Sequence, residues 1–97
     1  MYAVVVHLQL RGPLAAVEQC RVERALLDPL PATPGFRSMY VVRTGEARVT
    51  VFHAWDSRAD AEAASERFAT WVQINLGHEL AGPTERRAGD VLGARQA

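Results

Sequence analysis

Residues 48–60 read RVTVFHAWDSRAD, and this stretch decides the fold. Its first eight residues alternate between two sides, so that Val51 and His53 share a face, as is typical of a β-strand. The polar residues that follow break the strand and open a helix, for which Ser57 is a suitable N-cap. Asp60, three positions later, completes a capping-box-like pattern. The stretch therefore predicts a strand, a corner and the start of a helix in direct succession.

The rest of the chain predicts three more strands and one more helix around this stretch. Three prolines and a glycine within residues 28–35 end the first helix, and a polar stretch at 44–47 with one glycine fits a hairpin. Strands are expected at Tyr2–Leu10, Phe36–Arg43, Arg48–Trp55 and Arg86–Leu92, and helices at Pro13–Leu27 and from the cap at Ser57 to the cap at Gly77. The order βαββαβ predicts one α+β domain over residues 1–97, with a ferredoxin-like four-stranded antiparallel sheet and a loose tail at 93–97.

The strands carry more apolar residues than two helices on one face of a sheet can cover. The first half of the first strand is apolar on both sides, and neither face of the strand at 48–55 is plainly polar. The chain is 48% hydrophobic, which is much apolar material for so short a domain. We therefore expect a homodimer that pairs the two uncovered sheet faces about a two-fold axis.

The charges and the single cysteine exclude several classes of protein. Eleven arginines balance eleven acidic residues and there is no lysine, so no basic face for nucleic acid is expected. Cys20 excludes an internal disulfide and favours a reducing compartment, and within the first helix it is expected to be a buried, inert thiol. The sequence has no apolar run of membrane-spanning length and no signal-peptide pattern, so a cytoplasmic protein without a membrane partner is expected.

Chemistry separates the families that share this order of elements. A heavy-metal-binding domain needs two thiolates, and the chain has one cysteine. An RNA-recognition module needs exposed aromatic residues on a central strand, which residues 41–44 (VVRT) do not supply. An acylphosphatase needs a glycine-rich phosphate cradle after the first strand, and residues 11–14 (RGPL) are too short and too proline-bound for one.

Two short signatures resemble those of the antibiotic biosynthesis monooxygenase (ABM) superfamily. They are Pro34-Gly35-Phe36-Arg37 before the second strand and Ala54-Trp55-Asp56-Ser57-Arg58 at the corner, followed by Gly-Asp-Val-Leu at 89–92. These motifs build the fold, because the glycine permits a tight entry and the Trp-Asp-Ser segment turns the corner and caps the helix. The resemblance implies a dimeric α/β barrel with a pocket between the sheet and the helices of each subunit.

The resemblance also implies chemistry. Some members oxidise phenolic or quinol-like aromatics with molecular oxygen and no cofactor, whereas others bind and open haem. The first reaction needs a hydrophobic pocket, a base that removes a phenolic proton, and donors that hold the resulting anion.

Five residues are the main candidates for such a pocket. Trp71, with Phe68 near it on the second helix, is expected to line the pocket, although aromatic residues at helical spacing are also typical of a core. His7 and His53 are expected in adjacent positions of paired strands, where either could be the base or a satisfied sheet histidine. Tyr40 on the second strand could donate its hydroxyl.

Other residues have more conditional roles. Arg67 and Asn75 lie one turn on either side of Trp71 and could place polar groups toward the same space, whereas Trp55 fits a structural corner residue. His78 is the natural candidate for a haem axial ligand, but the first strand lacks the asparagine of the haem-degrading members, which disfavours haem. Three scattered histidines without cysteine or acidic residues at ligand spacing predict no metal site.

Three readings of the function remain open. The first is a cofactor-independent monooxygenase that acts on a small phenol, quinol or polyketide-like aromatic. The second is a non-enzymatic dimeric barrel that binds a small molecule or regulates. The third, and the least favoured, is haem binding or degradation.

Overall fold

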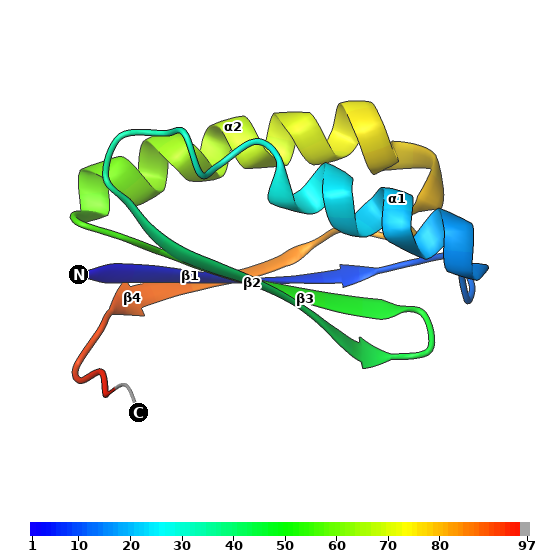
Figure 1. The fold of residues 1–97 in the computed structure, drawn as a ribbon, viewed down its shortest axis with the longest axis horizontal. Helices are drawn as coiled ribbons and strands as arrows, with labels where there is room; N and C mark the ends of the chain where they lie inside the picture. Colours follow the sequence, from blue (N-terminus) through cyan, green and yellow to red (C-terminus); the bar gives the residue numbers. More distant parts are fainter. Residues whose placement is uncertain (96–97) are drawn as a thin grey trace.

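The computed structural model describes residues 1–95, in which two helices lie on one face of a four-stranded sheet (Figure 1). The elements are β1 (Tyr2–Gln9), α1 (Ala16–Leu27), β2 (Phe36–Gly45), β3 (Arg48–Trp55), α2 (Arg58–Leu76), a 3-10 turn η1 (Gly77–Glu79) and β4 (Glu85–Asp90). The strands lie in the order β2-β3-β1-β4, and every neighbouring pair is antiparallel. This confirms the expected α+β, ferredoxin-like βαββαβ class.

The alternation of β3 gives the sheet its two faces. Val51, His53 and Trp55 are buried on the side of the helices, whereas Thr50 and Phe52 lie on the opposite side and are half-buried. The core between sheet and helices collects the even-numbered apolar residues of β1, Leu10 just after it, and the inward faces of both helices: Val4, Val6, Leu8, Leu10, Val22, Leu26, Ala61, Ala64, Phe68, Val72 and Leu76. The face of β3 that carries His53 therefore points into the space between the sheet and the helices.

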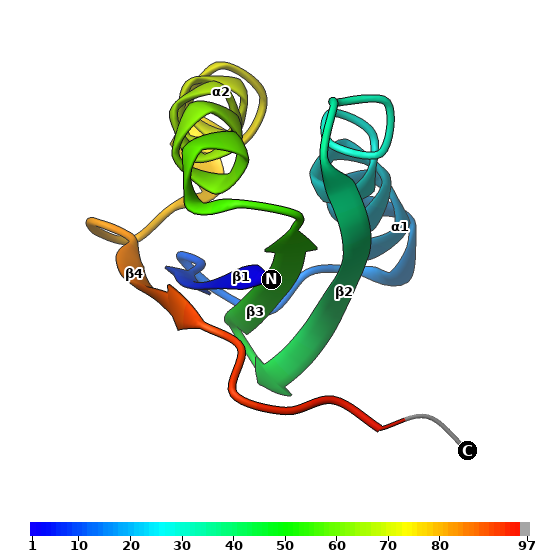
Figure 2. The same ribbon diagram turned by 90° about the vertical axis from the view of Figure 1, so that its left-hand side faces the viewer.

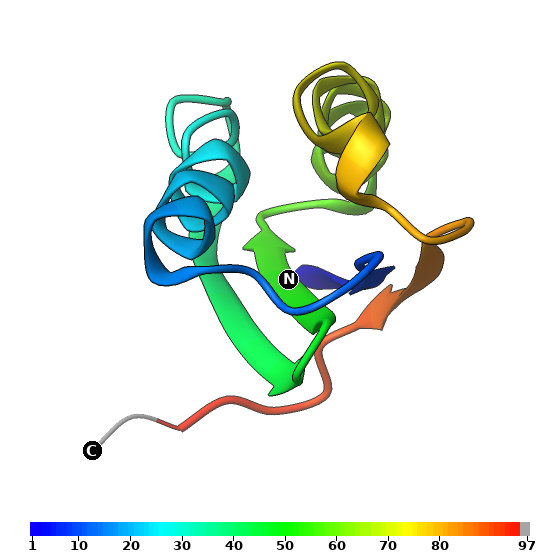
Figure 3. The ribbon, with the colours of Figure 1, turned by 90° about the vertical axis from the view of Figure 1, so that its right-hand side faces the viewer.

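The two helices divide the covered face between them. Views along the sheet show α1 on the β2 side and α2 on the β4 side (Figures 2 and 3). Contacts of α2 with β1 and β3, and of α1 with β2, agree with this division. The other face of the sheet carries no helix, as both end-on views show.

The two ABM-like signatures meet at one end of β3. The backbone N–H of Asp56 donates to the carbonyl oxygen of Gly35 over 2.9 Å, and Gly35 has a φ of 84°, which favours glycine. Ser57 caps α2 by accepting a hydrogen bond from the backbone N–H of Asp60 over 3.2 Å. The predicted tight entry, corner and helix cap are all confirmed.

Several expected boundaries and one expected burial were wrong. The first helix begins at Ala16 instead of Pro13, because Leu14 packs against the core from a segment whose backbone is still extended at Ala15. Cys20 is exposed, because the inward face of α1 is defined by Val22 and Leu26 and a residue two positions from Val22 points away from it.

The C-terminal part of the chain also differs in detail. Gly77 follows the last residue of α2, as predicted. Its backbone has right-handed helical angles, and it is the first residue of η1. The last strand ends at Asp90 instead of Leu92, because its partner β1 begins at Tyr2, and beyond this pair a single backbone hydrogen bond, from the Val91 N–H to the Met1 carbonyl oxygen, continues the pairing. Residues 93–95 are exposed and have no regular structure, and residues 96–97 of the expected tail lie outside the described residues.

Candidate functional site

Two separate cavities lie between the helices and the sheet. The larger, of about 250 Å³, lies under α1 and has aliphatic walls that include Leu14, Val22 and Leu26, with Arg43 and Glu46 at its hairpin end. The smaller, of about 90 Å³, lies between α2 and the strands β1 and β4. We call it the α2 cavity; it is the one that contains a candidate catalytic residue, His53.

His53 is fully buried and has one hydrogen-bond partner. The indole Nε1–H of Trp55 donates to Nδ1 of His53 over 2.6 Å. Because an indole N–H can only donate, Nδ1 must offer its lone pair, and the proton of the neutral imidazole therefore lies on Nε2. Two residues of one strand that share a face thus fix the tautomer of the histidine.

The Nε2–H of His53 is a buried donor without a partner among residues 1–95. Burial, followed by the positive charge of Arg86, lowers the pKa of His53 from 6.5 to about 4, so the ring is neutral at neutral pH. An unpaired buried donor costs roughly 1–3 kcal/mol. Since Nδ1 is occupied by Trp55 and His53 lines the α2 cavity, Nε2–H is the polar group that this ring can offer to a molecule in the cavity.

Arg86 and Ser65 form the polar rim of the α2 cavity. Arg86 faces the helices because it pairs with Val6 in the register of β1 and β4, and its guanidinium donates to the hydroxyl oxygen of Ser65 over 3.2 Å. Both residues line the cavity, and Arg86 is exposed at its mouth. Among the described residues, the Arg86–Ser65 pair forms the side-chain hydrogen bond that joins β4 to α2.

An aromatic cluster supports the inner end of the α2 cavity. The ring of His53 makes edge-on contacts with Phe68 and with Trp55, at centroid distances of 5.6 and 5.7 Å. Trp55 makes a further edge-on contact with Phe36 at 5.6 Å. The position of the imidazole is therefore fixed by packing as well as by the indole hydrogen bond.

The expectation that His7 and His53 lie in adjacent positions is wrong. His7 pairs with Thr50, whereas His53 pairs with Val4, three positions along the same two strands. The odd-numbered His7 lies on the face of the sheet without helices, where its Nδ1 and the Thr50 hydroxyl are 2.9 Å apart. A three-residue separation inverts the face, so the two histidines cannot share a pocket within one chain.

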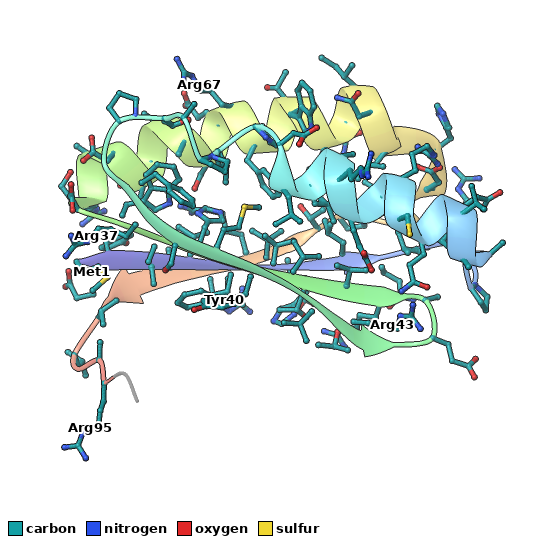
Figure 4. The ribbon with its side chains drawn as sticks, in the orientation of Figure 1. Met1, Arg37, Tyr40, Arg43, Arg67 and Arg95 are labelled. Carbon is teal, nitrogen blue, oxygen red and sulfur yellow. The ribbon has the colours of Figure 1, made fainter. Side chains whose placement is uncertain are left out.

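Tyr40 is also on the face without helices. Figure 4 shows its side chain below the sheet, on the side away from α1 and α2. Its ring lies 6.1 Å from that of Phe52, and 61% of its surface is exposed. The structure therefore does not bring the Tyr40 hydroxyl into either helix-to-sheet cavity.

Trp71 and Asn75 lie between the two helices instead of over the sheet. The indole of Trp71 donates to the carbonyl oxygen of Ala25 on α1 over 2.5 Å, and the Asn75 amide donates to the backbone carbonyl of Trp71. The inward face of α2 carries Val72, one residue further on, so Trp71 is half-buried and does not line the α2 cavity.

Arg67 and His78 are exposed and line neither helix-to-sheet cavity. Figure 4 shows Arg67 on the outer side of α2, pointing away from the sheet. His78 belongs to η1, beyond the end of α2. Of the predicted site residues, the structure thus brings His53 and Phe68 together on the α2 cavity, and Trp71 and Asn75 together between the helices.

Sequence reasoning missed Arg86 and Ser65. The sequence ERRAGD of β4 has no apolar alternation, so nothing in the strand itself says which arginine faces the helices. That information lies in the pairing of β4 with β1, where Val6 is opposite Arg86 and Val5 is opposite Arg87. Ser65 could have been found from its position one turn before Phe68 on the inward side of α2.

Two further kinds of site were tested in the described residues. Within residues 1–95, no group of three or more His, Cys, Asp or Glu side chains is placed to hold a metal ion. In the same part of the chain, neither helix combines the length and the apolar character needed to cross a membrane.

Comparison with known sequences and structures places the fold. No model of a known protein family matches the chain, and no curated protein matches it by sequence. A monooxygenase of Streptomyces coelicolor, solved with nanaomycin D, has a TM-score of 0.73 at 18% identity, over 99% of this chain and 91% of that one. SnoaB of Streptomyces nogalater, a cofactor-independent oxygenase, has a TM-score of 0.69 at 14% identity, over 96% of this chain and 94% of that one.

Other solved structures agree with these two. A Nitrosomonas europaea protein of unknown function has a TM-score of 0.75 at 20% identity, over 99% of this chain and 93% of that one. Several more structures are named antibiotic biosynthesis monooxygenases. At these identities the likeness establishes a shared fold, and it confirms the resemblance to the ABM architecture that the two signatures indicated.

Proposed function

We propose that this chain is a cofactor-independent monooxygenase that oxidises a small phenol- or quinol-like aromatic at the opening between α2 and β4. Its fold is shared with proteins described as oxygenases, one of them cofactor-independent. The observation that carries the proposal is the buried, unpartnered Nε2–H of His53 in a cavity that is also lined by the cationic Arg86. Donors fixed in an apolar cavity stabilise an oxygen on which negative charge develops.

The substrate itself supplies the electrons for this reaction. Ionisation of a phenolic hydroxyl makes the ring electron-rich enough to react with dioxygen. A ring C–H or methylene carbon becomes a carbonyl, one oxygen atom enters the product, and the other leaves as water with the two hydrogens that the substrate loses. His53 and Arg86 favour the ionised substrate, because donors to the charged form lower the pKa of an acid.

His53 fits the role of donor better than that of base. A base needs a free lone pair on a ring nitrogen, and the lone pair at Nδ1 already accepts the indole hydrogen of Trp55. With its pKa lowered to about 4, the ring also holds an added proton poorly. The phenolic proton therefore passes to solvent at the exposed mouth beside Arg86, before the ionised oxygen moves inward to His53.

The substrate enters by widening the gap between α2 and β4. The α2 cavity has about 90 Å³, whereas an apolar cavity that holds benzene has about 150 Å³. The side-chain link to be broken is the hydrogen bond from Arg86 to Ser65, both of which are on the mouth. The ring then packs against Phe68, and its oxygen reaches Nε2–H of His53.

The same proposal includes a homodimer through the face of the sheet without helices. Phe52 and Val5 are half-buried on this face, and Tyr40 and Val42 are 61% and 49% exposed. A standard interface covers roughly 800 Å² per partner, about an eighth of the 6325 Å² surface of the chain. A second copy would cover these apolar side chains and leave both α2 cavities open at the outer edges.

A non-enzymatic binding barrel is the second candidate, and two observations favour it. The α2 cavity as it stands is too small for an aromatic ring, and His53 lacks a free lone pair for general-base catalysis. A small ligand could satisfy the Nε2–H donor without any reaction. In that case the chain would bind a ligand in the same cavity and consume no oxygen.

The residues present do not fit haem. A haem site needs a large apolar pocket with an axial ligand directed at the iron. His78 is exposed in η1 and lines neither helix-to-sheet cavity, and His53 has its only free nitrogen protonated inside a cavity of about 90 Å³.

Oxygen uptake tests the proposal directly. Purified protein with EDTA is given a hydroquinone or an anthrone-type phenol, and the expected result is one dioxygen consumed per carbonyl product formed. His53→Phe keeps an aromatic ring but removes the donor and should lower kcat about a hundredfold, while His53→Gln, which keeps an N–H, should recover part of the rate. Arg86→Gln should slow turnover at least about tenfold.

Arg87→Gln is the matched control, since Arg87 is the next residue of β4 and points to the opposite face. Its rate should equal that of the unchanged protein. No uptake above buffer with either class of substrate, or equal rates for His53→Phe and the unchanged protein when both are folded by circular dichroism, would overturn the oxygenase proposal and leave the binding barrel.

A further inference from the structure

The only charge on the lining of the α2 cavity is positive. Its lining contains one charged side chain, that of Arg86, and no carboxylate. The Ser65 hydroxyl oxygen accepts from Arg86 and keeps its own hydrogen free to donate. His53 adds a second N–H at the inner end. These three donors, one of them cationic, line the same small space, together with the uncharged polar side chains of Gln73 and Thr84.

Trp55 ensures that His53 contributes a donor and not an acceptor. If Nδ1 carried the proton, two N–H groups would face each other over 2.6 Å, so the indole excludes this tautomer. Trp55 itself is fully buried and held by Phe36, which leaves it no alternative partner nearby. It is a positioning residue, since it acts on the cavity only through His53.

The size of the cavity limits what these donors can hold. About 90 Å³ is well below the roughly 150 Å³ that accommodates benzene, yet far above the ~15 Å³ that one water needs. The space therefore suits a molecule of a few heavy atoms. Its other walls are formed by apolar side chains, among them Val6, Leu8 and Phe68, and by the polar side chains of Gln73 and Thr84.

We infer that the inner end of the α2 cavity is a binding site for a small monovalent anion, held between Nε2–H of His53 and the guanidinium of Arg86. Water could also satisfy the histidine, but an anion in addition pairs with the arginine, and charge-assisted hydrogen bonds are about twice as strong as neutral ones. The site binds its anion whether or not the chain oxidises a phenol, so it goes beyond the proposed activity.

Azide is a suitable probe because it has three atoms and one negative charge. Protein labelled with ¹⁵N is titrated with sodium azide at pH 7.5, with ionic strength held constant by sodium gluconate, whose anion is too large for the cavity. The imidazole ¹⁵N resonances of His53 are followed, and those of His7 and His78 serve as internal references. The expected result is a saturable shift at Nε2 of His53, with a millimolar midpoint, and none at the two reference histidines.

Three variants make the assignment specific. Arg86→Gln should weaken azide binding about tenfold, while Arg87→Gln, with its side chain on the other face, should leave the midpoint unchanged. Trp55→Phe should move both ring nitrogen shifts of His53 toward the average of two tautomers and weaken azide several-fold. Gluconate alone should shift nothing.

The outcomes that overturn the inference are equally concrete. One is the absence of a saturable shift at His53 up to about 0.1 M azide. The other is equal azide binding by the Arg86→Gln and Arg87→Gln variants. Either result would mean that the cavity holds water and no anion. If Trp55→Phe does not fold, the tautomer is read from the unchanged protein, where a proton found on Nδ1 would contradict the site. Azide binding without oxygen uptake would support the anion site and reject the oxygenase, so the two proposals fail separately.

Discussion

The backbone of Gly35 lies against the carboxylate of Asp60, so closely that a Cβ at residue 35 would stand 2.3 Å from Oδ2 of Asp60. The same glycine has a φ of 84° and accepts the backbone hydrogen bond of Asp56. The entry to β2, the corner after β3 and the first turn of α2 therefore share one crowded point. The hydrogen bond from Asp56 to Gly35 joins the two ABM-like signatures directly, and the contact with Asp60 leaves no room there for a side chain at residue 35.

Gly35→Ala should destabilise the protein strongly. A positive φ costs a residue with a Cβ about 1–2 kcal/mol, and the clash with Asp60 adds to that. We expect the free energy of unfolding to fall by at least about 2 kcal/mol and Tm by about 10 °C, measured by urea and thermal unfolding. Gly82→Ala, where a Cβ meets nothing within 4 Å, is the control and should change little. Equal effects of the two substitutions would contradict this account of the corner.

The protein should lose stability as the pH falls from about 6.5 to about 4 because of His53. Its pKa is about 4 in the folded chain and near 6.5 when unfolded, so in this range the unfolded chain binds more protons. The resulting loss is about 2 kcal/mol between pH 7 and pH 5. Urea unfolding of His53→Phe at the same two pH values isolates the effect, since all carboxylates remain. A loss of the same size in the variant would mean that His53 is not responsible.

Trp71→Phe should weaken the contact between the helices. The substitution removes the donor to the Ala25 carbonyl and leaves that carbonyl half-buried without its indole partner, at a cost of about 1–2 kcal/mol. Because Trp71 lies outside the α2 cavity, we expect the loss in thermal stability without a matching loss in oxygen uptake per folded molecule. A folded variant with slowed uptake would instead support the catalytic role that the sequence suggested for Trp71.

Val42→Arg should break the proposed dimer. Val42 is 49% exposed on the face without helices, and an arginine there would be buried without a partner in a face-to-face pair. Light scattering should give twice the 10.7 kDa monomer mass for the unchanged chain and the monomer mass itself for the variant. Val17→Arg is the control, because Val17 is 82% exposed on α1. A monomer before any substitution would refute the assembly.

Local patterns predicted the elements of the fold well, because their causes lie within a few residues. The alternation of β3 predicted which residues share a face, and Ser57 and Asp60 predicted the helix cap. The excess of apolar side chains on the strands has its counterpart in the exposed Tyr40 and Val42. Each of these inferences needed only the period of a strand or the chemistry of a helix end.

The site was harder to predict, because it depends on pairings between distant residues. The sequence places histidines on two neighbouring strands, but the pairing of Val4 with His53 decides that His7 faces the other way. The pairing of Val6 with Arg86 likewise decides which of two adjacent arginines reaches the cavity. On α2 the inward face carries Val72, whereas Trp71 is turned toward α1 by its hydrogen bond to the Ala25 carbonyl, a contact between distant residues.

The edge position of β4 has a consequence for how the protein behaves in concentrated solution. An unpaired strand edge can add a strand from another molecule, and natural edges resist this with charge. Four of the six residues of β4 are charged: Glu85, Arg86, Arg87 and Asp90. The chain has no net charge, so general electrostatic repulsion between molecules is weak. The short, charged edge strand therefore protects against edge-to-edge aggregation of the sheets. The strand that supplies an arginine to the cavity thus also keeps the molecules apart, and variants of that arginine should be compared in dilute solution.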